Sequence, residues 1–72
     1  MQTSTKHFVL CIESGDAEDL EKGKVYQSLP DVQAEAEGLL RVIDESLEDY
    51  LYPTEYFVEL QLPQRAVDAL AA

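Results

Sequence analysis

Short apolar segments, rich in β-branched residues and separated by polar turns, recur along the chain and predict five β-strands. In the last of these segments Val58, Leu60 and Leu62 alternate with Glu59 and Gln61, which is the clearest strand pattern in the sequence. Five short strands joined by turns indicate a small barrel or sandwich. The expected strands are residues 7–12, 24–29, 39–43, 50–52 and 58–62.

The segment between the second and third strands predicts a short helix over residues 32–37. Asp31 stands at the N-cap position, and Gly38 stands where a residue that ends a helix is expected. A helix of two turns is not stable alone, so it should pack against the strands through Val32 and Ala36.

Two prolines mark the remaining turns. Pro53 predicts a tight turn over residues 53–56, because its ring fixes φ at the first turn position. Pro63 ends the last strand. After it, the spacing of Val67 and Leu70 predicts a final helical turn or two, which either docks or frays.

A chain of 72 residues is one domain at most. We expect a flexible tail over residues 1–6, a barrel over 7–62, and a short helical or frayed C-terminus over 63–72. The polar stretch 13–22 predicts a solvated loop, with Leu20 as its apolar anchor beneath the barrel.

The chain is strongly acidic: 15 Asp and Glu face 5 Lys and Arg, for a formal net charge of -10. Nucleic acids and anionic membrane surfaces attract clusters of Lys and Arg, so neither is an expected partner. Long-range attraction favours a basic protein or peptide instead. A second explanation stays open, in which the acidity only keeps the protein soluble, as in many cytosolic bacterial-type proteins.

The sequence gives no sign of export or of a bound metal. The apolar run 8–12 is too short for a signal peptide or a membrane span, so a cytoplasmic location is expected. Cys11 is the only cysteine, which excludes an internal disulfide, and we expect it to be an inert residue of a buried strand. His7 stands alone beside the tail, and no cofactor or metal is expected.

Three segments of the chain resemble SH3 domains. Residues 18–25 (EDLEKGKV) resemble the acidic loop that precedes a Lys-Gly turn, and residues 38–41 (GLLR) resemble the later Gly with bulky residues. Residues 51–60 (LYPTEYFVEL) are similar to the Leu-Phe-Pro-x-x-Tyr-Val segment before the last strand. The resemblance covers roughly residues 8–62. It implies a mainly β fold, a five-stranded SH3-like barrel with one short helix in a loop.

A weaker resemblance points to a family of short uncharacterised bacterial proteins with an SH3-like barrel. It rests on residues 23–26, 41–46 and 50–53.

The SH3 resemblance also implies a peptide site. SH3 domains that bind Pro-rich peptides use a groove of stacked aromatic residues beside an acidic loop. Pro53 and Tyr56 match residues of that groove, and Asp16, Glu18 and Asp19 match the loop that meets a basic ligand residue.

The chain also departs from that pattern. Residues 9–12 hold no tyrosine where SH3 domains carry groove tyrosines, and Leu39 or Leu40 takes the place of the groove tryptophan. Only half of the groove is present, so the resemblance supports the fold better than it supports binding of Pro-rich peptides.

The aromatic residues allow two interpretations: an exposed patch for a partner, or side chains that half-pack a core too small to bury them. They are Tyr26, Tyr50, Tyr52, Tyr56 and Phe57.

The acidic runs allow alternatives as well. The run 16–21 lacks the spacing of an EF-hand loop, which favours a solvated loop over a calcium site. The run 44–49 sits on a predicted turn without the enclosed pocket that a general acid needs. Some of its carboxylates are expected to pair with Arg41.

We therefore expect a non-catalytic protein- or peptide-binding module whose partner is basic. The alternative is an acidic charge mimic, an antitoxin-like inhibitor of a basic nucleic-acid-binding protein. A third hypothesis is self-association through an exposed sheet edge, although a monomer is expected. The predicted binding residues are Tyr52, Pro53, Tyr56, Asp16, Glu18 and Asp19.

Overall fold

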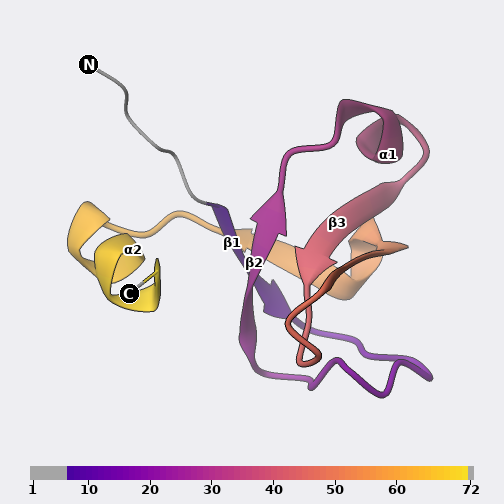
Figure 1. Cartoon of the computed structure of the whole chain (residues 1–72), viewed down its shortest axis with the longest axis horizontal. Coiled ribbons are helices and arrows are strands. Elements are labelled where there is room, and N and C mark those ends of the chain that lie inside the picture. The colour runs from indigo at the N-terminus through magenta and orange to yellow at the C-terminus, as the bar shows by residue number, and fades with distance from the viewer. Residues whose placement is uncertain (1–6, 72) are drawn as a thin grey trace.

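The computed structural model describes residues 7–71 and contains five strands, two α-helices and one 3₁₀ turn (Figure 1). The expected tail over residues 1–6 lies outside the described residues, as does residue 72. In chain order the elements are β1 His7–Cys11, β2 Val25–Leu29, α1 Val32–Ala36, β3 Leu39–Ile43, β4 Asp49–Pro53, η1 Thr54–Tyr56, β5 Phe57–Leu60 and α2 Gln64–Ala71.

The strands form one antiparallel sheet in the order β4-β3-β2-β1-β5. Neighbours in sequence pair with each other along β1, β2, β3 and β4, whereas β5 returns to pair with β1, where Cys11 lies opposite Phe57. The prediction of a mainly β protein with five strands is confirmed. The pairings leave β4 and β5 at the two ends of the strand order and do not by themselves close a barrel.

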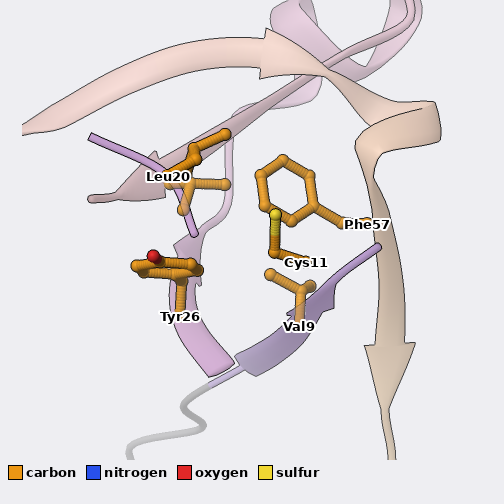
Figure 2. Packing of buried hydrophobic residues seen from close by; sticks show 6 residues of the cluster. Val9, Cys11, Leu20, Tyr26 and Phe57 are labelled. Atoms are coloured by element: carbon orange, nitrogen blue, oxygen red, sulfur yellow. The ribbon is translucent and has the colours of Figure 1, made fainter. Parts of the chain in front are cut away.

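The core lies on one face of this sheet (Figure 2). Val9 and Cys11 are two residues apart on β1, so both side chains point to the same face, where Val42 of β3 and Phe57 of β5 meet them. Leu20 reaches this cluster from the loop between β1 and β2, which confirms it as the apolar anchor of that loop. Cys11 is fully buried, as predicted.

Helix α1 begins where the sequence predicted, but it packs through a different residue. Asp31 is its N-cap, with Oδ1 accepting a 3.0 Å hydrogen bond from the backbone N–H of Ala34. The expected contacts through Val32 and Ala36 are wrong, because Val32 is 83% exposed and Ala36 is also exposed. Ala34 alone is buried, since a helix of five residues turns only one narrow face to the sheet.

The segment before the last strand forms the tight turn that Pro53 predicted. Residues of η1 follow Pro53, whose φ is -57°, and the N–H of Thr54 donates to the carbonyl of Gly38 at 3.0 Å. Strand β5 begins one residue earlier than expected, at Phe57, and this residue enters the core. Val58 is consequently on the opposite, half-exposed face of the sheet.

The C-terminal segment is helical rather than frayed. Within α2, Leu70 lines a shallow hollow that Phe8 and Val25 of the sheet also line. Phe8 is buried although it lies outside the main core cluster.

Candidate functional site

Two acidic segments that are far apart in the sequence meet at one end of the sheet. The β1–β2 loop carries Asp16, Glu18 and Asp19, and the β3–β4 turn carries Glu45 and Glu48; all five are exposed. The backbone N–H of Glu45 donates a 2.9 Å hydrogen bond to the carbonyl of Asp19. These five residues are called the acidic end below.

Tyr26 connects the acidic end to the core. Its ring is buried, while its hydroxyl donates to Oε2 of Glu45 at 2.7 Å and accepts from the N–H of Glu21 at 2.8 Å. Lys24 Nζ lies 3.3 Å from the same oxygen of Glu45. The hydrogen bond from Tyr26, followed by that from Lys24, lowers the pKa of Glu45, so this carboxylate stays charged at neutral pH.

Asp44 lies beneath the acidic end and is only 2% exposed. Its carboxylate accepts hydrogen bonds from the N–H of Ser46 at 2.9 Å, from the hydroxyl of Ser46 at 2.5 Å and from the hydroxyl of Tyr52 at 2.6 Å. Burial alone would raise the pKa of Asp44, but the hydrogen bonds from Ser46 and Tyr52 outweigh it and lower the pKa. This environment is the opposite of the one that keeps a general acid protonated; Asp44 fixes the turn.

Tyr56 lies against the acidic loop. Its carbonyl accepts hydrogen bonds from the N–H groups of Ile12 at 2.8 Å and Glu13 at 3.2 Å. The hydroxyl of Tyr56 occupies the space that a side chain at Gly15 would need, so ring and loop are in close contact. The structure therefore brings Tyr56 and the loop that carries Asp16 together.

The other predicted aromatic residue, Tyr52, serves the core more than the surface. It is half-buried, its hydroxyl is bonded to Asp44, and its ring meets Phe57 edge-on at 6.2 Å between centroids. Tyr50 is exposed and donates to Glu48 at 3.0 Å. Tyr26 and Phe57 thus belong to the core, and Tyr52 and Tyr56 pack against it, whereas Tyr50 does not. Tyr56 is half-exposed at the loop, and Pro53 is half-buried across from Leu39.

Leu47 is a surface residue that the sequence interpretation missed. It is 83% exposed at the tip of the β3–β4 turn, and its φ of 71° lies in the left-handed region. This conformation is unfavourable for a residue with a branched side chain. An apolar residue within the acidic run 44–49 was the signal that could have found it.

Arg41 joins two acidic residues that are not among the five of the acidic end. Its guanidinium contacts Oδ2 of Asp31 and Oδ2 of Asp49, each at 2.8 Å. The expected pairing within the run 44–49 is confirmed for Asp49, while the pairing with Asp31 was not anticipated.

Within residues 7–71, no group of three or more His, Cys, Asp or Glu side chains is arranged to hold a metal ion. None of the helices described is long and apolar enough to cross a membrane. Comparisons with protein-family models, curated proteins and solved structures gave no match.

Proposed function

We propose that this chain is a non-catalytic binding module, with an SH3-like barrel, that holds a basic protein or peptide at its acidic end. The hydrogen bond between Glu45 and Asp19 carries the proposal, because it joins two acidic segments into one surface. Complementary charge across an interface speeds association and selects the partner.

The strand order and the last turn support an SH3-like barrel. The order β4-β3-β2-β1-β5 places the first and last strands side by side, and η1 lies between β4 and β5 at the Pro53–Tyr56 segment. A strongly twisted sheet of five short strands can curl until its edges approach each other around one core.

The charge of the molecule supports a basic partner. A net charge of -10 produces a negative field that attracts cations over about 8 Å at physiological ionic strength. Lys24 offsets part of this charge through Glu21 and Glu45. The carboxylates of Asp16 and Glu18 are exposed in the same loop and can meet Lys or Arg of a partner.

Two side chains can add apolar contacts with such a partner to the attraction between charges. Tyr56 offers a half-exposed ring beside the loop, and Leu47 offers an exposed apolar side chain on the turn. Aromatic and apolar anchors next to charged groups are typical of binding hot spots.

The test is a pull-down from cell lysate at low salt, eluted with a salt gradient, using two charge-matched variants. The double variant D16N/E18Q removes two charges from the acidic end, whereas E37Q/D68N removes two charges elsewhere. We expect a basic partner that elutes at lower salt from D16N/E18Q and at unchanged salt from E37Q/D68N. Capture that is equal for both variants, or independent of salt, would contradict the proposal.

The same experiment separates the charge-mimic alternative. A captured nucleic-acid-binding protein that is displaced by added double-stranded DNA would favour an acidic inhibitor. A captured protein that DNA does not displace, but that Tyr56→Ala releases, would favour the binding module.

A further inference from the structure

A cavity of ≈ 520 Å³ opens on the inner face of the sheet, away from the acidic end. His7 and Val9 line it at the beginning of β1, whereas the acidic loop follows the end of that strand. The other walls come from β2, α1, β3, η1 and β5, through Ser28, Glu35, Leu40, Thr54 and Phe57. The volume lies within the range of about 300–1,000 Å³ that is usual for binding pockets.

The floor of this cavity is apolar and continuous with the core. Val9 and Phe57, which Figure 2 shows within the buried cluster, both line it. Leu40 packs against the same cluster from β3. An apolar group that enters the cavity would therefore remove apolar surface from water, at roughly 25 cal/mol per Å².

The rim of the cavity is acidic. Glu35 and Glu59 are both exposed there, on α1 and β5. His7 Nδ1 lies 3.7 Å from Oε2 of Glu59 and offsets its charge only when the imidazole is protonated. Arg41, which lies on the neighbouring strand, is engaged by Asp31 and Asp49. The rim thus attracts a cation, while the floor favours an apolar group.

We propose that this cavity is a second docking site, which receives an apolar side chain of a partner protein segment whose adjacent Lys or Arg contacts Glu35 and Glu59. The charge of the rim determines the choice of occupant. A second copy of this chain is disfavoured there, since two molecules of net charge -10 repel each other. The site is separate from the acidic end and does not depend on the function proposed for it.

The test is an NMR titration of the ¹⁵N-labelled full chain with acetyl-Arg-Leu-Phe-Arg-amide, and with the charge-reversed control acetyl-Glu-Leu-Phe-Glu-amide. We expect saturable shifts at the amides of Ser28, Leu40 and Glu59 with the basic peptide at up to about 5 mM. The variant E35Q/E59Q should weaken this binding about three- to tenfold, whereas E37Q/D68N should leave it unchanged.

A third variant tests the cavity itself. Thr54 is exposed on the rim, so T54W should fill the opening without a change in the core, and it should abolish the shifts at Ser28 and Leu40. Three results would overturn the proposal: no saturable shifts, equal binding of the two peptides, or shifts confined to the acidic end.

Discussion

The hydroxyl of Tyr52 donates a 2.6 Å hydrogen bond to Oδ2 of the buried Asp44, and this bond fixes the β3–β4 turn against β4. Asp44 also accepts two hydrogen bonds from Ser46, so one carboxylate organises the whole turn. The acidic end depends on this turn, because Glu45 follows Asp44 directly in the chain.

Removal of the Tyr52 hydroxyl should destabilise the protein. Tyr52→Phe leaves the ring in place and takes away one partner of a buried carboxylate, so we expect a loss of about 1–2 kcal/mol in the free energy of unfolding. Urea unfolding followed by circular dichroism measures it. Tyr50→Phe is the matched control, because its hydroxyl partner Glu48 is exposed, and it should change stability far less. Equal effects of the two variants would contradict this role of Asp44.

Asp44 should also contribute to stability in a pH-dependent way. Its pKa in the folded protein lies below its ordinary value of 3.8, so its contribution is present above that value and is lost as pH falls through the lower folded value. The stability difference between the native chain and Asp44→Asn should therefore shrink below about pH 4. Near the pI of 4.1 the charge repulsion within the molecule is relieved, and this affects the native chain and Asp44→Asn alike. The difference in free energy of unfolding between the two chains, measured at each pH, therefore isolates the contribution of Asp44. A constant difference would contradict the lowered pKa.

At alkaline pH, Tyr26 should limit stability. Burial, assisted by the hydrogen bond to Glu45, raises the pKa of Tyr26 to about 12 from an ordinary 10.0. The folded state therefore keeps a proton that the unfolded chain loses, and stability should fall between pH 10 and about 12. Across this range, the free energy of unfolding should decrease more steeply with pH for the native chain than for Tyr26→Phe. Parallel curves for the two proteins would contradict the raised pKa of Tyr26.

Gly15 and Tyr56 should be energetically coupled. Gly15 has a φ of 53°, and a Cβ there would collide with the hydroxyl of Tyr56. Gly15→Ala should cost about 1–2 kcal/mol, partly from the backbone and partly from the collision. Gly38→Ala, whose φ is 78° in open space, measures the backbone part alone. In a Tyr56→Phe background the excess cost of Gly15→Ala should fall, and full additivity would argue against the contact.

Leu47 should lower the stability of the fold and contribute to binding of the basic partner. Leu47→Gly relieves a left-handed conformation at an exposed position, so we expect a gain of about 0.5–1 kcal/mol in the free energy of unfolding. The same variant should bind the captured basic partner more weakly. A loss of stability would contradict the strain, and unchanged binding would remove Leu47 from the anchors of the acidic end.

The sequence by itself determined the elements of this fold. Alternation and turn residues are local signals, and they located the five strands, the cap at Asp31 and the turn after Pro53 to within one or two residues. The burial of Cys11 and Leu20 also followed from their local context.

Only the tertiary structure decided which faces are buried and which segments meet. The local pattern assigned the packing of α1 to Val32, but the helix buries Ala34 instead. On β5, Phe57 enters the core and Val58 is exposed on the opposite face. The contact between Glu45 and Asp19 could not be read from the chain, because the two residues are 26 positions apart in the sequence, in two runs that only strand pairing brings together. Local periodicity encodes the elements, whereas long-range pairing places carboxylates from distant segments on one surface, and that surface carries the proposed function.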